Sequence, residues 1–190
     1  MVHQTYSQNN RTADEARGLQ SGTKAPVFAA RDAENSVFKL SDALKKGPVV
    51  LIFYRGHWCP VCNKHLAQIQ DSLSMITEKG ATLVAVSPEK PEYSNKMVEK
   101  TGAEFRLLYD EGYKIADAYD VTFTPRNRTL VMYNTMLGAN LKEAHSDDSQ
   151  RLPIPVTYII DQDGVIAWRH FNPDYKERAA VKDILENIPD

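Results

Sequence analysis

Residues 49–62 decide the fold of this chain, and they read Val-Val-Leu-Ile-Phe-Tyr-Arg-Gly-His-Trp-Cys-Pro-Val-Cys. The apolar run at 49–54 has no alternation, which is typical of a strand with both faces covered. Beyond Gly56 the apolar residues fall near one face of a 3.6-residue helix. This face comprises Val61, Leu66, Ile69, Leu73 and Ile76. The stretch therefore predicts a strand, a short turn and a helix running to Glu78, with two cysteines in the first helical turn.

The position of the cysteines favours thiol chemistry. Cys59 is expected near the N-cap and Pro60 at the first helical position, where a proline is tolerated because its missing N–H has no intrahelical partner. The free N–H groups and the positive end of the helix dipole favour a thiolate there, and a thiolate is the reactive form of cysteine. Two inert buried thiols are the alternative interpretation, but the strand–turn–helix context favours a redox pair of Cys59 and Cys62.

Composition narrows the class of protein. The chain has 190 residues and a formal net charge of −2, which suits one globular domain and gives no reason to expect nucleic acid or an anionic membrane as a partner. The longest apolar run is too short to span a bilayer. No secretory signal is visible in the first twenty residues, so the cytoplasm is the expected location. With two cysteines in total, any intramolecular disulfide must be Cys59–Cys62.

The middle of the chain predicts parallel strands joined by helices. A buried strand is expected at Ala81–Val86, a helix at Pro91–Thr101 ending at Gly102, and a short strand at Phe105–Tyr109. A further helix follows at 113–119. This order is typical of a βαβ core. Residues 1–20 are polar and are interpreted as an N-terminal arm or short helix that could help form a dimer, and residues 21–190 as the domain.

Residues 121–151 are predicted to be a helical insertion. Apolar residues recur there at helical spacing, namely Leu130, Met132, Tyr133, Met136, Leu137 and Leu141. We expect a helix or helical hairpin whose apolar stripe belongs to the core. As a hypothesis, the insertion also walls the active site or forms a dimer contact.

The last forty residues predict an antiparallel ending of the sheet. Val156–Ile160 is rich in β-branched and aromatic residues, and Asp161–Gly164 has the composition of a hairpin turn. Val165–Trp168 then returns as a second strand. Tyr175–Ile188 is predicted to be the closing amphipathic helix.

Residues 54–62 resemble the active-site segment of peroxiredoxin-like proteins of the alkyl hydroperoxide reductase/thiol-specific antioxidant (AhpC/TSA) group, within the thioredoxin-fold superfamily. The resemblance covers roughly residues 24–188. It implies a thioredoxin-like α/β fold, with a central mixed β-sheet flanked by helices on both faces. The N-terminal extension and the helical insertion are additions to that plan.

The sequence departs from the peroxiredoxin pattern at two positions. The family has a threonine three residues before its peroxide-reactive cysteine, and an arginine just before the strand that corresponds to 156–160. Here Cys59 stands at the threonine position, Cys62 at the peroxide-reactive position and Pro155 at the arginine position. Arg55 either supplies the missing cation or is a solvated charge at a strand end. Arg126, Arg128 and Arg151 are weaker candidates.

Other residues resemble the active sites of thioredoxin-fold enzymes. Pro155 resembles their cis-proline, which faces the Cys-x-x-Cys motif, and Trp58 resembles the tryptophan that shields the attacking sulfur. His57 is a candidate proton donor or base, although an exposed turn histidine is the preferred interpretation. Zinc ligation by His57, His65 and the two cysteines is set aside, because residues at a rigid helix start do not all converge on one ion.

The expected function is that of a thiol-dependent oxidoreductase that reduces hydroperoxides. A protein disulfide oxidoreductase is the alternative, and a non-enzymatic redox sensor or binding module is the second. Cys59 would attack first in disulfide exchange, whereas Cys62 would attack in a peroxidase; access and the helix dipole favour Cys59. No flavin, nicotinamide or metal site is evident, so electrons would come from a thioredoxin, a glutaredoxin or a small thiol. A homodimer is left open.

Overall fold

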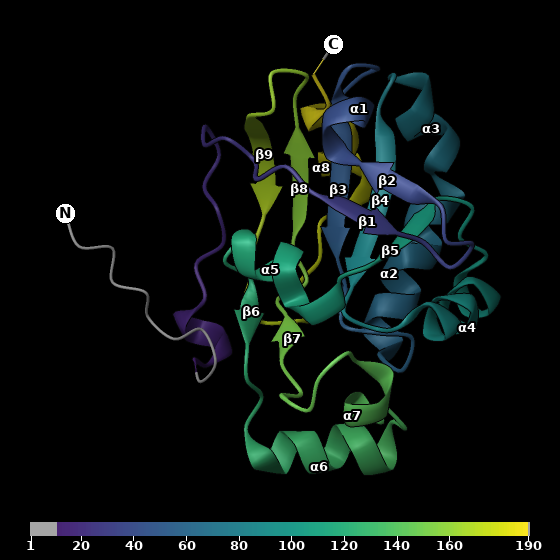
Figure 1. Ribbon diagram of the computed structural model, residues 1–190. Coiled ribbons are helices and arrows are strands. Elements are labelled where there is room, and N and C mark those ends of the chain that lie inside the picture. The colour runs from purple at the N-terminus through teal and green to yellow at the C-terminus, as the bar shows by residue number, and fades with distance from the viewer. Residues whose placement is uncertain (1–10, 190) are drawn as a thin grey trace.

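A seven-stranded sheet forms the centre of the computed structural model, which describes residues 11–189 (Figure 1). The strand order is β2-β1-β5-β4-β3-β8-β9. The sheet is mixed, because β3, β4 and β5 run parallel while β8, β9, β1 and β2 pair antiparallel with their neighbours. The strands are β1 (Ala29–Arg31), β2 (Val37–Lys39), β3 (Val49–Phe53), β4 (Thr82–Ser87), β5 (Arg106–Tyr109), β8 (Thr157–Ile160) and β9 (Ile166–His170).

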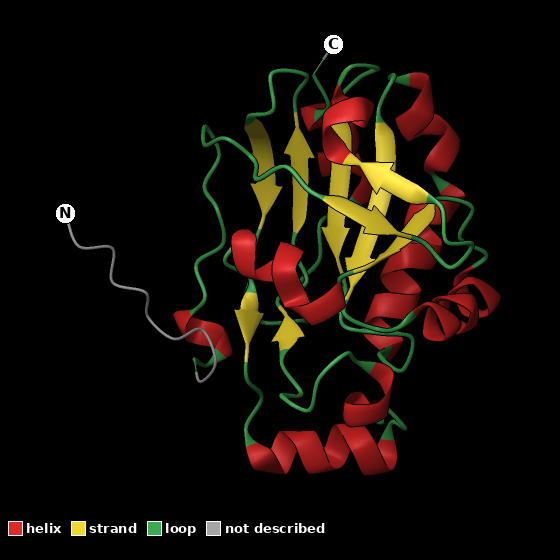
Figure 2. Cartoon of the chain, in the orientation of Figure 1, coloured by secondary structure: helices red, strands yellow, loops and turns green. Residues whose placement is uncertain are grey.

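Helices cover both faces of this sheet (Figure 2). The α-helices are α1 (Leu40–Leu44), α2 (Pro60–Asp71), α3 (Leu73–Glu78), α4 (Pro91–Thr101), α5 (Lys114–Ala118), α6 (Asn127–Met136), α7 (Leu141–Ala144) and α8 (Val181–Asn187), and short 3-10 turns lie at η2 (Ala13–Glu15) and η3 (Glu111–Tyr113). One apolar cluster joins α2, α3, α4, α6 and α8 to the sheet, and the other joins α1 and α5 to the opposite face. The expected α/β architecture is confirmed.

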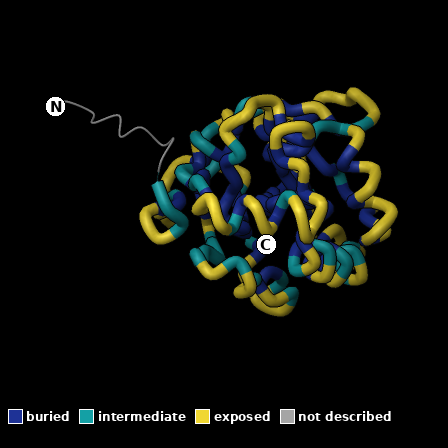
Figure 3. Tube along the Cα trace, turned by 90° about the horizontal axis from the view of Figure 1, so that it is seen from below, coloured by how far each residue is buried: buried dark blue, intermediate teal, exposed yellow. Residues whose placement is uncertain are grey.

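The central position of β3 explains why its sequence is an unbroken apolar run. Val50 and Ile52 belong to the first apolar cluster, while Leu51 and Phe53 belong to the second, and every residue of β3 is buried. A strand with helices on both sides has no solvent face, so its sequence does not alternate. Figure 3 shows buried segments inside the molecule and exposed segments mostly on its outside.

Most predicted elements are confirmed, and two helices differ in extent. The helix after the cysteines is interrupted at Ser72, where φ is −112° and ψ is 9°, so that α2 and α3 are separate. The closing helix begins at Val181 rather than at Tyr175. The residues before it form a loop with a turn at 173–176, in which Tyr175 packs over Arg55 and Arg178 reaches Cys62. Tertiary contacts thus override local helix propensity here.

Two helices, α6 and α7, occupy the stretch expected to hold the insertion. They stand between β6 (Thr122–Phe123) and β7 (Leu152–Pro153), which pair as a two-stranded ribbon, and α6 lies across the lower end of the molecule in Figure 1. The helical interpretation is confirmed. The expected core stripe is only half correct: Leu130 and Tyr133 are buried, whereas Met136 is 79% exposed. The helix therefore presents one face to the domain and the other to solvent.

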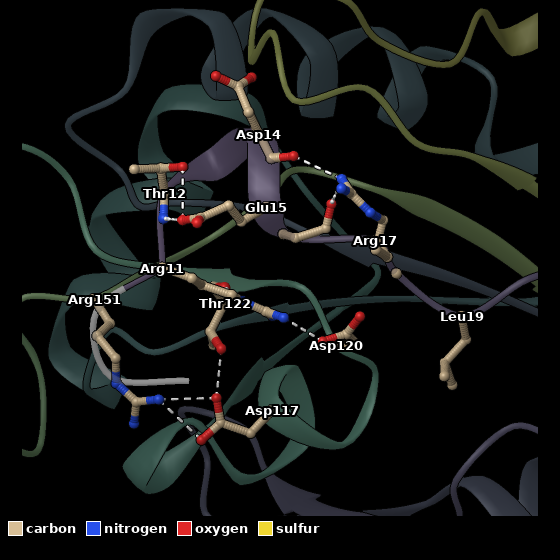
Figure 4. Close-up of polar contacts among 12 residues, drawn as sticks. Arg11, Thr12, Asp14, Glu15, Arg17, Leu19, Asp117, Asp120, Thr122 and Arg151 are labelled. Atoms are coloured by element: carbon tan, nitrogen blue, oxygen red, sulfur yellow. Dashed lines mark hydrogen bonds and ion pairs between the residues drawn. The ribbon is translucent and has the colours of Figure 1, made fainter. Parts of the chain in front are cut away.

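The described part of the N-terminal stretch is fastened to the domain (Figure 4). Arg11 donates to the backbone carbonyl of Thr122 and to the carboxylate of Asp120. Arg169 donates from the other side to the carbonyls of Arg17, Gly18 and Leu19. The expected short helix is represented by η2, whereas residues 1–10 of the arm lie outside the described residues. Over residues 11–189, no helix combines the length and apolarity needed to cross a membrane.

Candidate active site

The two cysteines lie where the sequence predicts them, at the start of α2. Cys59 is the N-cap residue, with extended backbone angles, and Pro60 opens the helix. The Cys59 Sγ accepts a hydrogen bond from the Cys62 backbone N–H, with N and sulfur 3.4 Å apart. Neither cysteine is in a disulfide, and both are buried; with Cys59 0% and Cys62 1% exposed, the expectation that access favours Cys59 is wrong. The cap sulfur thus satisfies an amide that would otherwise lack a partner at the helix end.

A tight turn carries the chain from β3 to Cys59. Gly56 has φ of +154°, and a Cβ at that position would lie 2.4 Å from the Trp58 Nε1 and 2.5 Å from the Glu89 Oε1. Only glycine fits such a conformation and such close neighbours. The next residue, His57, is 8% exposed, so the expected exposed turn histidine is wrong.

Glu89 holds this turn from the loop after β4. One carboxylate oxygen accepts from the His57 backbone N–H at 2.8 Å, and the other lies 2.9 Å from the His57 Nδ1. Glu89 is fully buried, and this burial raises its pKa against the opposing effect of His57. Sequence reasoning missed this residue. The available signal was an acidic residue just beyond a buried strand parallel to β3.

Arg55 lies beside the Cys59 sulfur. Its Nη2 donates to the Sγ at 3.1 Å, and its Nη1 donates to the Tyr133 hydroxyl at 2.8 Å. The guanidinium carbon lies 5.1 Å from the ring centroids of Trp58 and Tyr133, and 3.9 Å from that of Tyr175. Arg55 is 2% exposed, so the interpretation as a solvated strand-end charge is wrong. A cation in a desolvated aromatic cage acts on a neighbouring sulfur with little screening.

The pKa values of the two cysteines are shifted in opposite directions. A hydrogen bond from the Cys62 thiol, together with the charge and hydrogen bond of Arg55, outweighs burial and lowers the pKa of Cys59 to about 5. Burial, reinforced by the hydrogen bond to Cys59, raises the pKa of Cys62 well above its usual range. At neutral pH the first cysteine is therefore a thiolate and the second a thiol.

Trp58 and Pro155 are two further candidate residues from the sequence. The Trp58 ring is buried and packs against Tyr133, with ring centroids 4.8 Å apart. The expected cis bond before Pro155 is wrong, since all peptide bonds between described residues are trans. The flanking residues explain this: the Ile154 N–H donates to Val121 and the Val156 carbonyl accepts from Phe53, so an extended chain runs from β7 into β8. A trans proline fits an extended segment.

The remaining arginines lie in other settings. Arg126 and Arg128 are exposed at the start of α6. Arg151 donates to the Asp117 carboxylate at 2.9 Å. Arg178, rather than any of these three arginines, lies beside the cysteine pair, and its Nη2 is 3.5 Å from the Cys62 Sγ. Sequence reasoning did not single out Arg178, because nothing in its local pattern links residue 178 to the start of α2.

The two histidines near the cysteines have different hydrogen-bond partners. His57 is engaged by Glu89, whereas the His65 Nε2 lies 3.2 Å from the Ala179 carbonyl oxygen. Burial lowers the pKa of His65 to about 4, with Arg178 acting in the same direction, so this imidazole is neutral at physiological pH. In the part of the chain that the structure describes, no group of three or more His, Cys, Asp or Glu side chains is arranged to hold a metal ion.

Comparison with known proteins places this site in a family. The family model for the AhpC/TSA family matches residues 21–169. The chain belongs to the AhpC/TSA family. Among curated AhpC/TSA relatives, Peroxiredoxin Bcp of Bacillus subtilis (strain 168) is 33% identical over 109 residues, which is 57% of this chain and 69% of the relative. The thiol-disulfide oxidoreductase ResA of Bacillus thuringiensis (strain Al Hakam) is 24% identical over 161 residues, covering 84% and 75% of the two chains.

The fold of this AhpC/TSA member is also that of solved structures. Peroxidoxin BcpB of Mycobacterium tuberculosis superposes with a TM-score of 0.65 at 21% sequence identity, covering 80% of this chain and 86% of that chain. The thioredoxin-like fold expected from the resemblance is confirmed. The curated relatives carry the names of two kinds of thiol enzyme, peroxiredoxins and thiol-disulfide oxidoreductases.

Proposed function

We propose that this AhpC/TSA protein reduces hydroperoxides with Cys59 as the attacking thiolate and Cys62 as the resolving thiol. The observation that carries the proposal is the contact between the Arg55 Nη2 and the Cys59 Sγ. Arg55 stabilises the thiolate before the reaction, and it also lies where negative charge develops on the departing oxygen. This assignment differs from the one that the family motif implies, in which Cys62 attacks the peroxide. The buried Cys62 retains its proton and lacks the nucleophilic form.

The reaction has two steps. The Cys59 thiolate attacks one peroxide oxygen, the O–O bond breaks, and Cys59 becomes a sulfenic acid while the other oxygen leaves as an alkoxide. The alkoxide takes a proton from the Cys62 thiol or from solvent. Cys62 then attacks the Cys59 sulfur, the S–O bond breaks, and hydroxide leaves as the Cys59–Cys62 disulfide forms. One peroxide is reduced to an alcohol and one dithiol is oxidised.

The surroundings of Cys59 favour a small electrophile over a protein disulfide. Its exposed fraction is 0%, with Trp58 and Tyr133 also buried beside it. The Arg55 Nε is buried and has no hydrogen-bond partner in the described part of the chain. A peroxide oxygen that bound next to the sulfur would give that donor a partner. A substrate of two oxygens needs far less space than a peptide segment.

Disulfide exchange is the second candidate function, and one observation favours it. The low-pKa thiol is the first cysteine of the Cys-x-x-Cys motif and follows a tryptophan, which is the arrangement expected of an exchanger. A redox sensor remains the non-enzymatic alternative. A cytoplasmic location, a homodimer and a thioredoxin, glutaredoxin or small thiol as electron donor all stay predictions.

Steady-state turnover distinguishes these functions. The purified protein is assayed with hydrogen peroxide, an organic hydroperoxide and the insulin disulfide, each with a thioredoxin system and with a small thiol. We expect turnover of one or both peroxides that disappears in Cys59→Ser. Turnover of insulin alone would support the exchanger, and equal activity of wild type and Cys59→Ser would contradict enzymatic function for this pair.

A further inference from the structure

A cleft lies along the start of α2, next to Arg178, which contacts Cys62; neither cysteine lines it. It has a volume of about 510 Å³ and is lined by Pro60, Val61, Lys64, His65, Gln68, Lys176 and Arg178. Its walls are the first three turns of α2 and the loop between β9 and α8. That loop also carries Tyr175, which packs on Arg55. The cleft and the site thus share one loop, although the reaction described above leaves the cleft unused.

The lining of this cleft is cationic. Lys64, Lys176 and Arg178 contribute three positive charges and no carboxylate lines the cleft, although the whole chain has a net charge of −2. Over residues 11–189, none of these cations has a carboxylate oxygen within 4.0 Å. Asp174, on the same loop, is turned to the Lys176 backbone N–H. Unpaired cations around a concave surface attract an anionic ligand.

Arg178 connects this cleft to the redox pair. Its Nη2 lies 3.5 Å from the Cys62 Sγ, while its Nη1 is buried and has no hydrogen-bond partner among the described residues. A buried donor without a partner is costly, and a ligand carboxylate in the cleft would satisfy it. An anion held by Arg178 is therefore brought close to the sulfur of Cys62.

Leaving-group acidity makes Cys62 the favourable target for a reductant. In thiol–disulfide exchange the sulfur of lower pKa leaves faster. Here we expect that sulfur to be Cys59, to which Arg55 donates at 3.1 Å, whereas Arg178 lies 3.5 Å from the Cys62 sulfur. Attack on Cys62 expels the stabilised Cys59 thiolate, whereas attack on Cys59 would expel the less stable Cys62 thiolate.

We propose that the cleft binds the carboxylate of a small thiol, which then reduces the oxidised enzyme by attacking Cys62. This inference rests on the proposed function, because it assumes that Cys59–Cys62 is the product of the oxidative half-reaction. The thiolate of the first small thiol forms a bond to the Cys62 sulfur, and the Cys59–Cys62 bond breaks to release the Cys59 thiolate. A second small thiol attacks the sulfur of the bound one, so that a small disulfide leaves and Cys62 takes up a proton. Two small thiols are oxidised and one enzyme disulfide is reduced.

The experiment begins from protein oxidised with diamide, so that it does not depend on peroxide turnover. Reduction is followed by stopped-flow tryptophan fluorescence, since Trp58 adjoins Cys59, with 3-mercaptopropionate, 2-mercaptoethanol and cysteamine as anionic, neutral and cationic probes. Rates are compared per thiolate. We expect the anionic thiol to react about 10-fold faster than the neutral one, and the advantage to shrink with added salt.

The matched variants assign that preference to the cleft. Lys64→Gln/Lys176→Gln removes two exposed lysines that do not touch either sulfur, and Lys46→Gln removes an exposed lysine just beyond α1. Loss of the preference in the double variant alone would support the proposal. Equal rates for the three probes in wild type would overturn it, as would a preference that survives in the double variant. Reduction by a thioredoxin protein alone, with no small thiol reacting, would overturn it in favour of a protein donor. Failure of diamide to form the disulfide would instead refute the redox pair on which the proposed function depends.

Discussion

The Arg55 Nη2 lies 3.1 Å from the Cys59 Sγ, and both residues are buried. The two residues stand on either side of the turn between β3 and α2, so their contact depends on the shape of that turn. Gly56 allows the backbone conformation, and Glu89 fixes His57 within it. The acidity of Cys59 is consequently a property of the strand–turn–helix unit as a whole.

Replacing Arg55 by methionine should raise the pKa of Cys59. Arg55→Met keeps a long side chain in the aromatic cage but removes the charge and the hydrogen bond to the sulfur. We expect the thiolate absorbance near 240 nm, measured in Cys62→Ser backgrounds, to titrate at least about one pH unit higher than in the parent, or ~1.4 kcal/mol less thiolate stabilisation. Arg126→Gln, at an exposed arginine, is the control. An unchanged titration midpoint in Arg55→Met would contradict the role given to Arg55.

Tyr133→Phe tests how α6 takes part in the site. The substitution removes the hydroxyl that accepts from Arg55 and keeps the ring that packs on Trp58. We expect a loss of about 1 kcal/mol in the free energy of unfolding and a smaller rise in the Cys59 pKa than in Arg55→Met. Tyr113→Phe is a matched control, because the Tyr113 hydroxyl bonds to His145 instead. Both variants should lose stability, but a Cys59 titration that shifts equally in both would show that the contact with Arg55 is not the cause.

Glu89 should make the stability of the protein depend on pH. Burial raises its pKa above the ordinary value of 4.5, so the folded protein holds this proton at a pH where the unfolded chain has lost it. The contribution of the protonated carboxyl is present below 4.5 and is lost as the pH rises through the raised value. The stability of wild type relative to Glu89→Gln should therefore fall as the pH rises above 4.5. Urea unfolding at several pH values measures this difference, and Glu104→Gln, at an exposed glutamate, should leave the profile of wild type unchanged. A difference that grows with pH would contradict a buried, protonated carboxyl.

Local patterns predicted the part of this structure that depends on neighbours in sequence. The unbroken apolar run of β3, the helix start at Cys59 and Pro60, and the left-handed Gly102 that ends α4 all follow from the residues at those positions. The helical nature of 127–136 also followed from spacing. Each of these features is decided within a few residues.

The rest of the site comes from segments that the sequence does not connect. Tyr133 meets Arg55 across 78 positions, Glu89 meets His57 across 32, and Arg178 meets Cys62 across 116. Periodicity shows which side of a helix is apolar, but it does not show which loop will cover a given sulfur. The same limit explains the early start predicted for the last helix, since Tyr175 and Arg178 have helix-compatible side chains but are drawn to the cysteines.

Trapping the first oxidised species tests the central claim, that Cys59 attacks and Cys62 resolves. Cys59→Ser and Cys62→Ser are each treated with one equivalent of hydrogen peroxide in the presence of dimedone, and the adduct is located by peptide mass spectrometry. The account predicts a dimedone adduct on Cys59 in Cys62→Ser and none in Cys59→Ser. An adduct on Cys62 in Cys59→Ser, with Cys59 unmodified in the other variant, would contradict it.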